Sequence, residues 1–227
     1  MSKKLLLSLA PLFAVVAFAV TPAVAQAQLT YGNCVVIGLP HSGNCPNPAT
    51  ERFKAFATGT AVKVVSRKVP GSVDYTLTSA LGTITCKSLK DKGTVTNVLI
   101  GGVLTGTSEL TLEFDECTFG GCPVQTAGSG SGNIVGVVTD QVLTATTVSV
   151  KLAAAGIVIV FSGPPPTGCP AAGTALGTVT GSATGTQTAK TNVLKFNKTP
   201  GFKFNGEPAT ITGEDELETE GGLPVYI

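Results

Sequence analysis

The feature that most constrains the fold is an alternation of apolar and polar residues that begins near Ala57. The segment ELTLEFD, residues 109–115, shows it most clearly, because Leu110, Leu112 and Phe114 alternate with acidic residues and Thr. A repeat of two places successive side chains on opposite faces of a β-strand, and such a strand is half buried in an antiparallel sheet. No helical repeat longer than two turns follows residue 57.

Similar runs rich in Thr, Val and Ile recur along residues 57–227, separated by turn formers such as residues 90–93 and 127–133. They predict ten to twelve strands. The predicted fold class is therefore all-β, as a single antiparallel β-sandwich or closed β-barrel. Residues 28–56 are predicted to form a loop-rich, disulfide-closed leader, in which residues 49–56 form one or two helical turns.

The N-terminal residues 1–27 have the pattern of a secretory signal peptide. Lys3 and Lys4 precede an apolar stretch from Leu5 to Val20, and two A-x-A motifs end at Ala25 and Ala27. Cleavage after Ala25 or Ala27 is predicted; the alternative is a permanent membrane anchor, since the apolar stretch is borderline in length. The predicted location is secreted and extracellular, with association with the cell wall as a variant.

Six cysteines lie beyond the predicted signal peptide, and in an oxidising compartment they indicate three disulfides. Structural zinc is the competing interpretation, but the one C-x₄-C pair, Cys117 and Cys122, has no matching second pair. Cys34 and Cys45 are predicted to pair within the leader. For the other four, we favour Cys117–Cys122 across a tight turn together with Cys86–Cys169. The alternative is Cys86–Cys117 with Cys122–Cys169.

Several short motifs between residues 75 and 222 carry a family resemblance. They are GTITCKS…KGTVT, LEFDEC followed by GGC, a later FSG…GC, and NKTPGFKFNGEP…DELETEGG. With the signal peptide, this part of the chain resembles a group of uncharacterised secreted β-rich proteins of actinobacteria. The resemblance implies a secreted β-rich fold, and it implies no catalytic mechanism.

Nucleophilic catalysis of the Ser-His-Asp or Cys-His kind requires an imidazole base. His41 is the only histidine, and it lies in a Pro/Gly/Ser/Asn-rich loop, which favours a surface role. No P-loop, G-x-S-x-G or H-E-x-x-H motif occurs. No cofactor is predicted.

The candidate catalytic residues are Glu109, Glu113 and Asp115, which share the polar face of one strand. Paired carboxylates can act as acid and base in glycoside hydrolysis. Such sites also use aromatic platforms, and the chain has no Trp and only three Tyr. The simpler interpretation is a solvated face on which these acids pair with Lys63, Arg67 or Lys87.

A second acidic run near the C-terminus could bind Ca²⁺ through hard oxygen ligands. Its spacing lacks the glycine-punctuated pattern of calcium loops, and a charged edge strand or tail is the simpler interpretation. No metal site is predicted. The carboxylates of this run are Glu214, Asp215, Glu216, Glu218 and Glu220.

The net charge argues against nucleic acids and anionic membranes as partners. Without Lys3 and Lys4, the 15 basic residues become 13 against 14 acidic residues, which gives a net charge near −1. Such a chain lacks the basic surface that nucleic acids or anionic membranes attract. Two function hypotheses remain: a secreted, non-catalytic β-domain protein that binds an extracellular or envelope ligand, and a secreted, glycosidase-like hydrolase that uses residues 109–116.

Overall fold

The computed structural model describes residues 29–36, 45–47, 50–163, 168–187 and 191–227. The predicted signal peptide and His41 lie outside these ranges. All regular structure in the described part is β, with fifteen strands against the predicted ten to twelve. The strands are β1 Gly32–Val36, β2 Glu51–Ala55, β3 Val62–Lys68, β4 Tyr75–Ser79, β5 Gly82–Cys86, β6 Ser88–Ile100, β7 Val103–Asp115, β8 Thr118–Phe119, β9 Cys122–Thr126, β10 Ile134–Thr144, β11 Thr147–Leu152, β12 Ile157–Phe161, β13 Ala175–Gln187, β14 Val193–Phe204 and β15 Glu207–Thr219.

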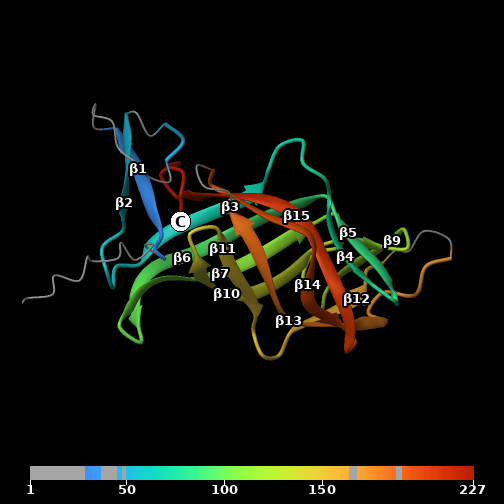
Figure 1. Cartoon of the computed structure of the whole chain (residues 1–227). Coiled ribbons are helices and arrows are strands. Elements are labelled where there is room, and N and C mark those ends of the chain that lie inside the picture. The colour runs from blue at the N-terminus through green and yellow to red at the C-terminus, as the bar shows by residue number, and fades with distance from the viewer. Residues whose placement is uncertain (1–28, 37–44, 48–49, 164–167, 188–190) are drawn as a thin grey trace, which may run out of the picture.

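Thirteen of these strands form one antiparallel sheet that closes on itself, which confirms the predicted fold class. The pairing of β11 with β13 closes a ring through β10, β7, β6, β3, β15 and β14. The pairing of β15 with β4 closes a second ring through β14, β13, β12, β9, β8 and β5. The long strands β13, β14 and β15 belong to both rings, and Figure 1 shows the resulting elongated body.

The two rings use different halves of the shared strands. Residues 182–186 of β13 pair with β11, whereas residues 175–179 pair with β12. Likewise, residues 215–219 of β15 pair with β3, and residues 209–212 pair with β4. The rings therefore lie one beyond the other along the body, with β4, β5, β9 and β12 at the end away from β1 and β2 (Figure 1).

Alternation along each strand places the apolar residues inside the closed sheet. On β7, Leu110, Leu112 and Phe114 face the interior as predicted, and they join Val95, Val138 and Phe204 in one core. The interior is tight in places: a Cβ on Gly93 would collide with the backbone of Glu109 and Leu110 on β7. Because Gly93 has no side chain, β6 can lie close to β7 here, and residues 90–93, predicted to form a turn, instead continue β6. Asp91 lies inside and the flanking lysines outside, which satisfies the alternation.

The leader differs from the prediction in one element. Residues 51–55 form β2 and not a helix, and β2 pairs with β1 in a separate two-stranded sheet. The sequence ERFKA itself alternates, with Arg52 and Lys54 exposed on one side. The Cys34–Cys45 disulfide, predicted from proximity in the sequence, is present.

The acidic C-terminal run is also located differently from the prediction. It lies in β15, which pairs with β14, β3 and β4 and is therefore an interior strand of the sheet and not an edge or tail. The outward carboxylates on β15 bind cations on the neighbouring strands: Glu214 pairs with Lys195, and Glu216 with Arg67. Asp215, between them, faces the interior.

The favoured pairing of the other cysteines is wrong, and the alternative is present: Cys86–Cys117 and Cys122–Cys169. Gly120 and Gly121 form a two-residue turn with φ values of 58° and 82°. This turn places Cys122 opposite Phe119, so that Val124 and not Cys122 lies opposite Cys117. Because Thr85 pairs with Thr118, Cys117 lies directly across from Cys86 on β5.

The three disulfides indicate an oxidising compartment, as expected for an extracellular protein. The described residues contain no helix that is long and apolar enough to cross a membrane.

The leader is attached to the main sheet by Asn97 of β6, whose side chain is fully buried. Its Oδ1 accepts a hydrogen bond from the Tyr31 amide at 2.9 Å, and its Nδ2 donates to the carbonyls of Tyr31 and Phe56. The Tyr31 ring lies against Gly106 inside the first ring. Asn97 therefore fixes the chain on both sides of β1 and β2.

We expect Asn97→Ala to lower the free energy of unfolding by about 3 kcal/mol, because it removes three hydrogen bonds and leaves the buried Tyr31 amide without a partner. Urea denaturation measures this loss, and faster proteolysis within β1 and β2 should accompany it. The same substitution at exposed Asn197 of β14 is the matched control. A loss at Asn97 no larger than at Asn197 would contradict the attachment role.

Candidate functional site

The three candidate catalytic carboxylates lie on the outer face of β7, as the alternation predicts. Glu109 and Glu113 are four residues apart, about 13 Å along a strand, which is too far for a catalytic pair. Glu113 and Asp115 are about 7 Å apart by the same rise, within the range of inverting glycosidases. Asp115, however, accepts a hydrogen bond from Ser88 and pairs with Lys90 at 3.5 Å.

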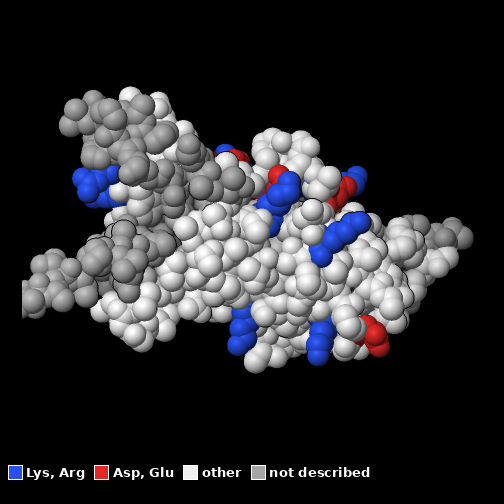
Figure 2. Space-filling view, in the orientation of Figure 1, with Lys and Arg blue, Asp and Glu red and all other residues white. Residues whose placement is uncertain are grey.

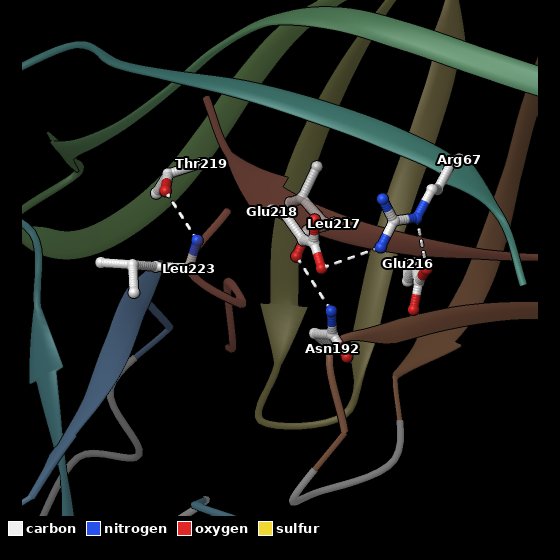
Figure 3. Close-up of polar contacts among 7 residues, drawn as sticks. All are labelled: Arg67, Asn192, Glu216, Leu217, Glu218, Thr219 and Leu223. Carbon is white, nitrogen blue, oxygen red and sulfur yellow. Dashed lines mark hydrogen bonds and ion pairs between the residues drawn. The ribbon is translucent and has the colours of Figure 1, made fainter. Parts of the chain in front are cut away.

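The predicted cations are not the partners of these acids. Lys63 pairs with Glu220, and Lys87 with Glu116. Arg67 binds Glu216 at 2.6 Å and Glu218 at 3.2 Å, as Figure 3 shows. The hydrogen bond and the charge of Glu216 raise the pKa of Arg67. Of the three acids, only Asp115 forms an ion pair within the described residues, and its partner Lys90 is a residue that the sequence argument did not select.

A polar hollow of about 440 Å³ lies on the outer face of β6, β7, β10 and β11, and we call it the hydroxyl groove. Hydroxyl and amide side chains make up most of its outward lining, with one acid and one base. Glu109 is the acid, and it is paired across the sheet with Thr94 and Thr139. The outward lining residues are Thr94, Thr96, Thr107, Thr139, Gln141 and Ser149, together with Glu109 and Lys151.

A second hollow of about 380 Å³ lies along β15, β3, β6 and β7 and includes Glu113. Its walls carry charges of both signs, among them Arg67, Lys90 and Glu216. Asp115 lines neither hollow. The surface in Figure 2 otherwise shows few charged side chains, spread over the visible face. The sequence therefore located the acidic strand correctly, but the structure does not bring its three acids together in one hollow.

Sequence reasoning missed a group of acids inside the first ring: Asp91 of β6, Asp140 of β10 and Asp215 of β15, here called the acidic cluster. All three are more than nine-tenths buried. Ser66 donates a hydrogen bond to Asp91 at 2.7 Å, and Ser108 donates one to Asp140 at 2.7 Å. The Tyr75 hydroxyl donates to Asp215 at 3.1 Å. The sequence did contain a clue to this group, because each Asp occupies an inward-facing position in a strand of alternating apolar and polar residues.

Burial dominates the ionisation of this cluster, since desolvation disfavours a charged carboxylate. It raises the pKa of Asp140 and of Asp215 to about 7. The pKa of Asp91 is raised well above its usual range by burial and by the neighbouring Asp215. The tyrosines that face the cluster, Tyr31 and Tyr75, have pKa values raised by burial, so both remain neutral.

The acidic cluster is electrically uncompensated within the part of the chain that the structure describes, because no Lys or Arg there is buried. In addition, Asp91 Oδ1 and Asp140 Oδ1 have no hydrogen-bond partner. Buried polar groups in native proteins are almost always paired. This arrangement therefore requires protons, water or a ligand to complete it.

The only set of potential metal ligands that converges among the described residues is Cys34, Cys45 and Glu51, and both sulfurs there form a disulfide. No family model matches the chain, and no curated protein or solved structure matches it either. Function is therefore inferred from the side chains themselves.

Proposed function

We propose that this chain is a secreted, non-catalytic β-domain protein that binds an extracellular or cell-envelope ligand in the hydroxyl groove. The observation that carries the proposal is the groove itself, a hollow of about 440 Å³ on a rigid, closed sheet. The three disulfides and the resemblance to secreted actinobacterial proteins support an extracellular setting. Placement on strands, and not on loops, holds the side chains in fixed positions.

The lining chemistry favours a polar and nearly neutral ligand. Threonine hydroxyls both donate and accept hydrogen bonds, and the Gln141 amide does the same. Side chains on one face of a strand repeat about every 7 Å, and strands lie about 5 Å apart. Such a lattice of donors and acceptors suits an extended polymer rich in hydroxyl or amide groups, such as an envelope polysaccharide.

We favour binding over hydrolysis because the acids of β7 are separated or already engaged. Glu109 is the one acid of the outward lining, and the other carboxylate that lines the groove, Asp140, is buried and bound by Ser108. Asp115 is held by Ser88 and Lys90 outside the groove. Glu113 accepts a hydrogen bond from Asn133. The hydrolase alternative requires two carboxylates on opposite sides of one scissile bond.

We expect Thr139→Arg to weaken ligand capture by about tenfold or more, equal to about 1.4 kcal/mol. Arginine at this position can reach Glu109 on the paired strand and fill the groove. Capture is measured with the mature chain on a glycan array and by pull-down of cell-wall material. Thr78→Arg, at an exposed position of β4 on the second ring, is the matched control.

Equal capture by both variants would show that the ligand binds elsewhere. Release of sugar from the captured material by the native chain, abolished in Glu109→Gln or Glu113→Gln, would instead support the hydrolase.

A further inference from the structure

The hairpin that joins β6 to β7 projects beyond the rest of the first ring. Its last neighbours are Thr58, opposite Asn97 of β6, and Leu29, opposite Thr105 of β7. Beyond these positions, in the described part of the chain, residues 98–104 pair only across the hairpin itself. Figure 1 shows this projection in green at the lower left.

The end of the hairpin is aliphatic and exposed to solvent. Leu99 is 67% exposed, Ile100 45% and Val103 38%, and we call these three residues the apolar tip. Leu99 and Ile100 are consecutive on β6, so their side chains point to opposite faces of the hairpin. Both faces of the tip are therefore apolar, unlike a strand in the body of the sheet, which buries its apolar face.

The surroundings of the tip carry no charge. The segments at this end of the ring are neighbours, because Gly59 donates a hydrogen bond to the carbonyl of Asn97 and Gln141 pairs with Thr107. Figure 2 shows the projection without charged side chains on the visible face. A group of exposed aliphatic side chains is typical of a surface that contacts another apolar phase. The three segments without Asp, Glu, Lys or Arg are residues 55–62, 93–108 and 141–150.

The base of the hairpin is held in place. Asn97 is fully buried, and its side chain binds backbone groups of Tyr31 and Phe56. The ladder between β6 and β7 continues to the pair Ile100 and Val103, so few backbone groups near the tip lack a partner. Paired backbone groups lower the free-energy cost of entering an apolar phase.

A lipid surface fits the tip better than a groove on a protein does. A groove covers one face of a strand, whereas lipid chains can surround a tip that is apolar on both faces. The chain also enters the body at this end, because Leu29 lies opposite Thr105. The apolar stretch from Leu5 to Val20 precedes Leu29 in the sequence. As the predicted signal peptide, it would bring this end of the body to the membrane during export.

We propose that the apolar tip inserts into the surface of a lipid layer in the cell envelope. Burial of apolar surface drives the insertion. The proposal therefore needs none of the basic charge by which proteins attach to anionic membranes. Three aliphatic side chains contribute less than one acyl chain does, so binding is reversible and needs lipid at about millimolar concentration.

Insertion of the tip leaves the hydroxyl groove accessible. Thr96, which lines the groove on β6, is four positions from Ile100, about 13 Å along the strand. Shallow insertion reaches about 5 to 10 Å into the lipid surface. The lipid contact and the groove are therefore separate sites, which can be tested independently.

Vesicle flotation with the disulfide-intact mature chain tests the proposal. One set of vesicles contains phosphatidylcholine alone, and a second set also contains anionic phosphatidylglycerol. We expect similar partition into both sets, because the tip carries no charge. For the same reason, partition should not fall between about 0.1 M and about 1 M salt, where screening weakens attraction between exposed charges.

The double variant Leu99→Ser with Ile100→Ser should weaken partition by about tenfold or more, because it removes two of the three inserted aliphatic side chains. The matched control is Leu81→Ser with Val158→Ser, which should leave partition unchanged. These side chains are 48% and 47% exposed and belong to the β4–β5 turn and β12, far from the tip. Urea denaturation checks that both variants fold, and both should still capture the ligand of the hydroxyl groove.

Val103→Trp gives a readout at the tip itself, because the native chain has no Trp. Its emission should shift to the blue on addition of vesicles, and lipids brominated in the acyl chains should quench it. Trp favours the membrane interface, so this variant should also partition more strongly than the native chain. Leu81→Trp is the control and should show neither the shift nor the quenching.

Four results would overturn the proposal. Equal partition of the two double Ser variants would show that the tip makes no contact with lipid. Partition that requires phosphatidylglycerol or is lost at high salt would show attraction by charge. A blue shift of Val103→Trp that grows with protein concentration without lipid would show an interface between copies of the chain. No partition of the native chain would show that the tip is structural, and continued capture by the groove would leave the proposed function intact.

Discussion

The free energy of unfolding should fall as the pH rises from about 4 to about 8, the reverse of ordinary acid denaturation. The cause is the acidic cluster, in which burial raises the pKa of Asp140 and of Asp215 to about 7. In the unfolded chain an aspartate has a pKa of about 4. Between these values the folded state binds more protons than the unfolded state, so unfolding releases protons and a higher pH favours it.

The penalty is absent below about pH 4, where both states are protonated, and complete above about pH 7. A difference of about three units in pKa corresponds to about 4 kcal/mol for each of the two groups. Both side chains are more than nine-tenths buried, so screening by solvent reduces this value little. Few single features of the molecule should have a larger effect on stability.

Urea denaturation at pH 4.5, 6 and 8 of the native chain, Asp140→Asn and Asp215→Asn measures the effect. Asparagine resembles the protonated acid, so both variants should match the native chain at pH 4.5 and exceed it at pH 8. His41 is present in all three proteins, so any contribution from it cancels. Parallel stability curves for the three proteins would contradict this account.

Replacement of Cys86 and Cys117 by alanine should lower the free energy of unfolding by about 4 kcal/mol, which is a large share of the stability of an ordinary domain. The bridge closes a loop with a sequence separation of 31 residues and joins β5 to the residue before β8. Both cysteines are buried in the core, so lost packing adds to the lost restriction of the unfolded chain.

The Cys122–Cys169 bridge has a sequence separation of 47 residues, and its removal should also cost about 4 kcal/mol by chain entropy. Removal of Cys34–Cys45, with a separation of 11, should cost less, about 3 kcal/mol, and should loosen only β1 and β2. Thermal melts of the three double variants measure this order. Peptide mapping without reduction should join Cys86 to Cys117, and a peptide joining Cys117 to Cys122 would contradict the topology.

The strands and the fold class could be predicted because alternation is a local property of the sequence. Leu110, Leu112 and Phe114 define the inner face of β7 without any knowledge of its neighbours. Local turn signals were less reliable. Residues 90–93 contain a glycine and three charges, yet they continue β6 because Gly93 allows close contact with β7.

Pairings between distant segments could not be derived in this way. Cys117 and Cys122 are close in sequence, but the two-residue turn at Gly120 and Gly121 directs them to different partners. The acidic cluster shows the same limit. Asp91, Asp140 and Asp215 lie on three strands, and only the closure of the ring brings them into one interior.

The sharing of β13, β14 and β15 by both rings has a consequence for the order of folding. Neither ring can close until these strands, residues 175–219, are available. Until then, β3, β4, β11 and β12 each present an unpaired edge, which is a site for aggregation. Contacts so distant along the chain make folding slow. We therefore expect shortened chains that lack β15 to associate with one another and not to form one ring alone, because the two rings form a single cooperative unit.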